Sequence, residues 1–304
     1  MIKNNNDLHS RGNMNDILLN KHDKDVSAEE LKRFQDFLHT HELKEIDFKG
    51  QRIKYYCSGK GDRTVFISPG WFNTPEYGFR SIMIFEEDFR VITPGMAIFR
   101  SLDDLSRAIN RILEVEGIEK VILVGGSAGG IMAQTYFKRH NQKVEAMILY
   151  NTLAPKKERN KNWALWLIRL LPFFVFRATV KKRQKKYFKV KIPEEAEARI
   201  RFNQALFNEM ISKKMNKKLL VSQMRLAYEF NEQDTYTLDD FKQWQGRVLV
   251  ISSEDDAGYK DVDILMKNLP NTELYTFPKG TGHMAPLIHQ EEFRKIIRDF
   301  LDKL

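Results

Sequence analysis

The chain has 304 residues, which is long for one average domain, and 42% of them are hydrophobic. It can therefore bury a large core, which excludes global disorder. The net charge is +9, and its positive excess lies in residues 154–191, where thirteen Lys or Arg accompany one acid, Glu158. That segment carries +12 and the rest of the chain −3, so a basic segment interrupts a mildly acidic protein. The single cysteine, Cys57, excludes an intramolecular disulfide and fits a reducing compartment.

Residues 1–26 are polar, rich in Asn and Lys, and lack the apolar core of a signal peptide. We predict a disordered N-terminus on a soluble, cytoplasmic protein. The sequence Ser27-Ala-Glu-Glu30 has the spacing of a capping box and predicts an amphipathic helix within residues 27–42.

Strand-like and helix-like patterns alternate after this helix. Short apolar runs predict strands, and apolar residues with a 3.6-residue spacing predict helices. The expected strands are 43–49, 52–58, 64–68, 89–93, 121–127, 146–150, 247–252 and 273–277. The expected helices are 102–116, the stretch from 127 to about 140, 261–269 and 291–304. This order predicts an α/β fold with a mostly parallel sheet of about eight strands flanked by helices.

The alternation stops between residues 154 and 243, where the pattern is helical throughout. Pro193 suits the first turn of a helix, and Asn231 suits a helix end. We therefore predict a helical cap over residues 154–243, inserted between two parts of the α/β core at 43–153 and 244–304.

The motif that points most directly to chemistry is Gly125-Gly-Ser-Ala-Gly129, which lies between an apolar strand and a helix. A G-x-S-x-G sequence in this setting is typical of a nucleophile elbow, a sharp turn that exposes the serine hydroxyl. The strained backbone at Ser127 requires small neighbours, and Gly125 and Gly129 supply them. Ser127 is the predicted nucleophile.

A serine hydroxyl needs a neighbouring base, which in turn needs an orienting group. His283 lies among glycines between the last strand and the last helix and is the predicted base, with an ordinary surface histidine as the alternative. Asp255 and Asp256 follow the strand 247–252, at the sheet edge where α/β proteins hold their sites. Asp255 is the preferred acid, Asp256 the second choice, and a plain acidic turn the alternative. The end of strand 146–150 reads Tyr-Asn-Thr, so no carboxylate is available there to act as the acid.

The order Ser127, Asp255, His283 resembles that of the α/β-hydrolases, and the resemblance extends from about residue 43 to residue 304. It rests on the G-x-S-x-G sequence, on the acids after the seventh strand, and on Gly282-His283 with Glu291-Glu-Phe293 eight residues later. The resemblance implies a serine hydrolase with a Ser-Asp-His triad and without a metal or an organic cofactor.

The resemblance also implies an oxyanion hole, made of the backbone N–H groups of Ala128 and Trp71. Two sequences depart from the family. Many members have His-Gly where this chain has Pro69-Gly70, and many follow the fourth strand with Asp-x-x-Gly-x-Gly, where this chain reads Pro94–Ser101. Both departures lie in loops on the substrate side.

The apolar cap suggests a small-molecule carboxylic ester with a hydrophobic acyl or alkyl group. The alternative is a catalytically inactive hydrolase-fold protein that binds or scaffolds. The altered loops favour it. The stretch Met147–Thr152 also has a short similarity to maspardin, a hydrolase-fold protein thought to act by binding.

The segment 163–186 places bulky apolar residues beside the cluster Lys181–Lys186. It suits a cap helix that closes the pocket, which is the preferred interpretation, with a helix in weak contact with an anionic membrane surface as a compatible alternative. Nucleic-acid binding is not expected, because the charge is local and no recognised module is present. The sequence carries no signal for the oligomeric state.

Overall fold

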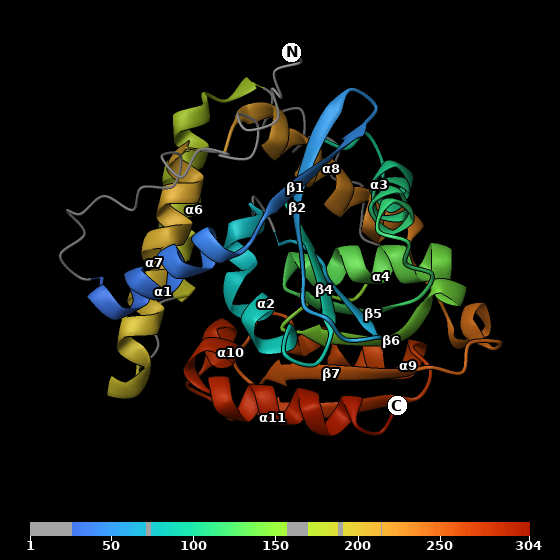
Figure 1. The fold of residues 1–304 in the computed structure, drawn as a ribbon. Coiled ribbons are helices and arrows are strands. Elements are labelled where there is room, and N and C mark those ends of the chain that lie inside the picture. The colour runs from blue at the N-terminus through green and yellow to red at the C-terminus, as the bar shows by residue number, and fades with distance from the viewer. Residues whose placement is uncertain (1–25, 71–73, 157–169, 188–190, 214) are drawn as a thin grey trace, which may run out of the picture.

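The computed structural model describes residues 26–70, 74–156, 170–187, 191–213 and 215–304. Its strands form one sheet in the order β1-β2-β4-β3-β5-β6-β7-β8 (Figure 1). Their bounds are β1 Leu43–Phe48, β2 Gln51–Ser58, β3 Thr64–Ile67, β4 Arg90–Pro94, β5 Val121–Gly126, β6 Val144–Tyr150, β7 Arg247–Ser253 and β8 Thr272–Phe277. Strand β2 pairs antiparallel with β1 and β4, and all other neighbours are parallel. The predicted α/β fold is confirmed. All but the last residue of the segment 1–26 lie outside the described residues.

Helices cover both faces of the sheet (Figure 1). Side chains alternate between the two sides of each strand, so an apolar strand presents hydrophobic side chains to the helices on both faces. In β5, Val121 and Leu123 join one core cluster, whereas Ile122 and Val124 join the other. The first cluster includes residues of α3 (Leu102–Val115), α4 (Ala128–His140) and α9 (Val262–Asn268). The second includes residues of α1 (Ala28–Thr40), α2 (Phe79–Phe85) and α11 (Gln290–Leu301). Near-continuous apolar strands are what a sheet buried on both faces requires.

Helix α1 begins where the sequence predicts, and the Ser27 Oγ accepts a hydrogen bond from the Glu30 N–H at 3.2 Å. The Glu30 carboxylate pairs with the Arg80 guanidinium, and the two side chains are only 8% and 9% exposed. On the same helix, Phe34 meets the rings of Phe79 and Phe202 edge-on. Helix α1 is therefore packed into the body of the protein and contacts both the core and the cap.

Three helices occupy most of the predicted cap: α6 (Phe173–Tyr187), α7 (Glu194–Lys213) and α8 (Lys217–Gln233) (Figure 1). Between them lies an apolar cluster built on Met210, Ile211, Met215, Leu219 and Leu220. The loops after β3 and β4 contribute Tyr77, Met96 and Ile98 to this cluster. This apolar cluster therefore faces loops at the carboxyl ends of the strands. None of the helices in the described part of the chain has the length and apolar character of a membrane span.

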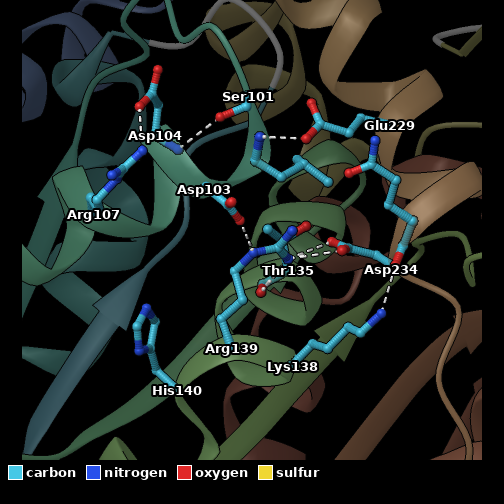
Figure 2. A network of polar contacts seen from close by, with 12 residues as sticks. Ser101, Asp103, Asp104, Arg107, Thr135, Lys138, Arg139, His140, Glu229 and Asp234 are labelled. Atoms are coloured by element: carbon cyan, nitrogen blue, oxygen red, sulfur yellow. Dashed lines mark hydrogen bonds and ion pairs between the residues drawn. The ribbon is translucent and has the colours of Figure 1, made fainter.

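A polar network joins the end of α8 to the end of α4 (Figure 2). The Arg139 guanidinium donates to both oxygens of Asp234, at 2.8 and 2.9 Å, and to Asp103 at 2.7 Å. Burial raises the pKa of Asp234, which is only 1% exposed, and the charge of Arg139 opposes that rise. Lys138 donates to two backbone carbonyls beside Asp234. Helix α8 is thus fixed to α4, the helix that begins directly after the predicted nucleophile.

Candidate active site

Four neighbouring strands of the sheet deliver the residues of the site. Strands β5, β6, β7 and β8 are parallel and adjacent, so their carboxyl ends meet at one edge. Ser127 follows β5, Asn151 follows β6, the pair Asp255 and Asp256 follows β7, and the His283 loop follows β8. The order of strands in the sheet therefore places distant sequence positions side by side.

Ser127 stands at a sharp turn between β5 and α4, with φ 52° and ψ −124°. The neighbouring backbone comes so close that side chains are excluded. A Cβ on Gly125 would lie 2.5 Å from the Gly129 carbonyl oxygen, and a Cβ on Gly129 would lie 2.5 Å from that of Ser68. The strained turn and both close approaches agree with the elbow geometry expected from G-x-S-x-G.

The elbow is also tied to the strand beside it. The Ser127 N–H donates to the Tyr150 carbonyl at 3.0 Å. The Ser127 carbonyl in turn accepts the Thr152 hydroxyl at 2.6 Å. These hydrogen bonds hold the serine backbone on both its N–H and its carbonyl side.

His283 forms its carboxylate contact with Asp256, which corrects the sequence-based preference for Asp255. The His283 Nδ1 lies 2.6 Å from the Asp256 Oδ2. The Asp256 side chain is 2% exposed, and its other oxygen accepts the Gly258 N–H at 2.7 Å. The reason for the difference is the turn after β7, which leaves Glu254 and Asp255 exposed and directs the next residue inward. The second choice, Asp256, is the residue that the fold brings to the histidine.

Asp255 has a different task in the same loop. Its two carboxylate oxygens accept the backbone N–H groups of Gly280, at 2.9 Å, and Gly282, at 3.0 Å. Both glycines have positive φ values, 99° and 50°, so this stretch of backbone bends sharply just before His283. Asp255 therefore holds the histidine loop and not the histidine ring.

Asn151 supports the loop from the other side, and sequence reasoning did not find it. It is 5% exposed and has φ 44°, and its amide nitrogen lies 3.3 Å from the His283 carbonyl oxygen and 3.5 Å from that of Gly282. An Asn directly after a buried strand is the available signal, because Asn tolerates a left-handed backbone better than most residues. The preceding residue, Tyr150, receives the Ser127 N–H, so this short segment bridges the elbow and the histidine loop.

Of the two predicted oxyanion donors, only Ala128 lies within the described residues. It is the first residue of α4 and is 2% exposed. The N–H groups of a first helical turn have no intrahelical acceptor, so this one suits a developing negative charge. Trp71 lies outside the described residues.

No group of three or more His, Cys, Asp or Glu side chains within the described ranges is arranged to hold a metal ion. The Cys57 thiol is half-buried on β2 and accepts a hydrogen bond from the Arg90 side chain at 3.4 Å. Burial raises the pKa of that thiol, which disfavours the reactive thiolate. Cys57 is therefore a poor candidate nucleophile, and Ser127 remains the predicted one.

A strained serine between strand and helix, with a histidine–carboxylate pair at the same sheet edge, is the arrangement expected of a nucleophile-elbow site. Residues 68–290 match the model of the family described as "alpha/beta hydrolase fold", and the chain belongs to this family. The family assignment thus agrees with the expectation drawn from the three motifs.

Individual relatives are distant. A 2-hydroxy-6-oxononadienedioate/2-hydroxy-6-oxononatrienedioate hydrolase of Paraburkholderia phymatum is 24% identical over 271 residues, covering 82% of this chain and 91% of its own. The structure of a thermophilic esterase from Thermogutta terrifontis superposes with a TM-score of 0.65 at 15% identity, over 86% of this chain and 98% of its own. The structure of a carboxylesterase from Bacillus subtilis superposes with a TM-score of 0.61 at 13% identity, over 90% of this chain and 97% of its own. The likeness to these solved structures concerns the fold.

Proposed function

We propose that this protein is a serine hydrolase that cleaves carboxylic esters through an acyl-enzyme. The observation that carries the proposal is the contact of the His283 Nδ1 with the buried Asp256 carboxylate, at the sheet edge where the elbow presents Ser127. A carboxylate on Nδ1 keeps the proton on that nitrogen, so Nε2 is left as the base.

In the proposed reaction, the His283 Nε2 takes the hydroxyl proton as the Ser127 Oγ attacks the ester carbonyl carbon. The N–H groups of Ala128 and, in the proposal, Trp71 stabilise the oxyanion. Collapse of the tetrahedral intermediate expels the alcohol, which takes the proton from His283. Water then attacks the acyl-enzyme by the same route and releases the acid.

We further propose that the ester carries a hydrophobic acyl or alkyl group. The cap interior is lined with Met, Leu and Ile side chains and meets the loops after β3 and β4. The proposal places the enzyme in the cytoplasm, in keeping with its single cysteine.

The test combines covalent labelling with turnover. We expect a fluorophosphonate probe to label the protein, and the substitution Ser127→Ala to abolish both labelling and cleavage of p-nitrophenyl esters of increasing acyl length. Ser58→Ala is the matched control, because the Ser58 hydroxyl on β2 is buried and accepts or donates no hydrogen bond. Folded protein that is neither labelled nor active would reject the proposed enzymatic function and favour a binding or scaffold role. Labelling without ester cleavage would reject the substrate class alone, and dienedioate compounds of the kind named for the Paraburkholderia relative would be tried next.

A further inference from the structure

Helix α6 presents apolar residues in two directions. Phe173, Phe176 and Val180 pack into the apolar cluster of the cap. Phe174, in contrast, is 71% exposed, and Leu170 and Leu171 just before the helix are 59% and 40% exposed. A helix that only closes a pocket needs one apolar face, so the exposed trio Leu170, Leu171 and Phe174 has no role in cap packing.

The sequence of α6 and its flanks is rich in cations and contains no acid. Helix α6 contains six Lys or Arg and no acid, and no Asp or Glu occurs from residue 159 to residue 193. Lys182 is exposed, and the helical repeat places positions 181 and 185 on the face of Phe174. From α8, the Lys217 Nζ donates to the Leu171 carbonyl at 3.1 Å, which brings a further cation to the edge of the trio.

We propose that the trio and the cations of α6 form a docking surface for an anionic lipid bilayer. Exposed Leu and Phe side chains beside a run of Lys and Arg are the composition of a helix that lies in the membrane interface. A second copy of the chain fits this face poorly, because pairing would bring two strongly cationic helices together. Bilayer binding satisfies both features at once, since the apolar trio enters the acyl boundary while the cations meet the headgroups.

The position of α6 connects this surface to the candidate site. The helix lies close to the short turn Gly282–Met284, which carries His283. Docking through α6 therefore places the proposed catalytic histidine near the lipid surface, where esters with long acyl chains are concentrated. This last step rests on the proposed function, whereas the docking itself does not.

Vesicle pelleting of the full chain tests the docking. We expect the protein to pellet with an equal mixture of phosphatidylcholine and phosphatidylglycerol, to stay in the supernatant with phosphatidylcholine alone, and to be released by salt. The triple variant Leu170→Ser, Leu171→Ser, Phe174→Ser is expected to reduce the partition coefficient at least about tenfold. Each Lys→Ser change at 181, 182, 185 or 186 is expected to reduce it about fivefold, from about 1 kcal/mol per cation near the surface.

Leu274→Ser is the matched control, because Leu274 on β8 is 43% exposed, about as exposed as Leu171. Ser127→Ala separates docking from catalysis and is expected to pellet like the unaltered chain. Equal pelleting with both vesicle types, absence of pelleting, or unchanged pelleting of the triple variant would each overturn the proposal. So would a dimer in gel filtration that the triple variant dissociates, because the surface would then belong to a second copy.

Discussion

Replacing Asp256 with Asn tests the assignment of the acid, because the hydrogen-bond pattern around that carboxylate dictates the outcome. Its Oδ1 accepts the Gly258 N–H at 2.7 Å, and its Oδ2 faces the His283 Nδ1 at 2.6 Å. A backbone N–H can only donate, so the single oxygen of an Asn side chain must stay with Gly258. The Asn NH₂ group then faces Nδ1, which can only accept from it. The proton consequently moves to Nε2, and the ring can no longer take the Ser127 proton.

The size of the effect follows from this change of tautomer. Loss of the correct tautomer by the same substitution in a Ser-His-Asp triad lowers kcat about 10⁴-fold, or about 5 kcal/mol of transition-state stabilisation. Asp255→Asn is the matched comparison, since that carboxylate also accepts two N–H groups but neither belongs to the ring. It forfeits one hydrogen bond to the loop, and solvent screens the exposed group, so we expect a fall of about tenfold or less.

The assay measures kcat and KM of both variants on a p-nitrophenyl ester across the pH range, with thermal unfolding as a check on the fold. We expect Asp256→Asn to lose kcat with little change in KM, and Asp255→Asn to keep the pH profile of the unaltered enzyme. A larger loss from Asp255→Asn than from Asp256→Asn, with both proteins folded, would refute the reasoning and return the triad acid to Asp255.

The remaining predictions concern stability. Gly126→Ala places a Cβ 1.9 Å from the Tyr150 ring, so we expect it to cost about 2–3 kcal/mol and lower the Tm by several degrees; an unchanged Tm would contradict the packing described. Burial works against ionisation of Glu116, but hydrogen bonds from the Tyr55 and Lys44 side chains outweigh it and lower the pKa to about 2. Because the folded-state pKa lies below the unfolded value, this stabilisation is present above about pH 4.5 and is lost as the pH falls toward 2. Glu116→Gln is therefore expected to lower the free energy of unfolding by about 2 kcal/mol at neutral pH and by little at pH 2, as urea titrations would show. Arg139→Met leaves the buried Asp234 carboxylate without the guanidinium nitrogen that donates to both of its oxygens, for an expected loss of about 3 kcal/mol in the same titrations, and a loss below about 1 kcal/mol would contradict the burial of that pair.

The sequence predicted the sheet and the elbow because both depend on local signals. Apolar runs fix which stretches are strands, and each predicted strand overlaps an observed one, with bounds that differ by one or two residues. The elbow needs only a strand, a G-x-S-x-G sequence and a helix in succession, and α4 begins directly after Ser127. The N-terminal helix was also predictable, but its capping box was only half right, because Glu30 bonds to Arg80 and not back to the cap.

The acid could not be chosen from the sequence, because the choice depends on the path of a turn. Strand β7 extends to Ser253, one residue further than its apolar pattern, and the next three residues turn away from the strand direction. Period-two alternation no longer applies there, so adjacent aspartates differ only in what the fold places beside them. One carboxylate meets the histidine ring, and the other meets the backbone that leads to it.

The amide at position 151 explains why the carboxylate that faces His283 comes from β7 and not from β6. Asn151 faces two carbonyl oxygens of the histidine loop, and only a donor can satisfy both. A carboxylate there would repel those carbonyls and add a second negative charge beside the buried Asp256. Asp255, on the opposite side, faces N–H groups of the same loop, where a carboxylate is the stronger partner. Where the histidine loop presents carbonyl oxygens, the adjacent strand end carries the amide of Asn151, and where the loop presents N–H groups, the strand end carries the carboxylate of Asp255. Asp256 is then the carboxylate that faces the His283 imidazole.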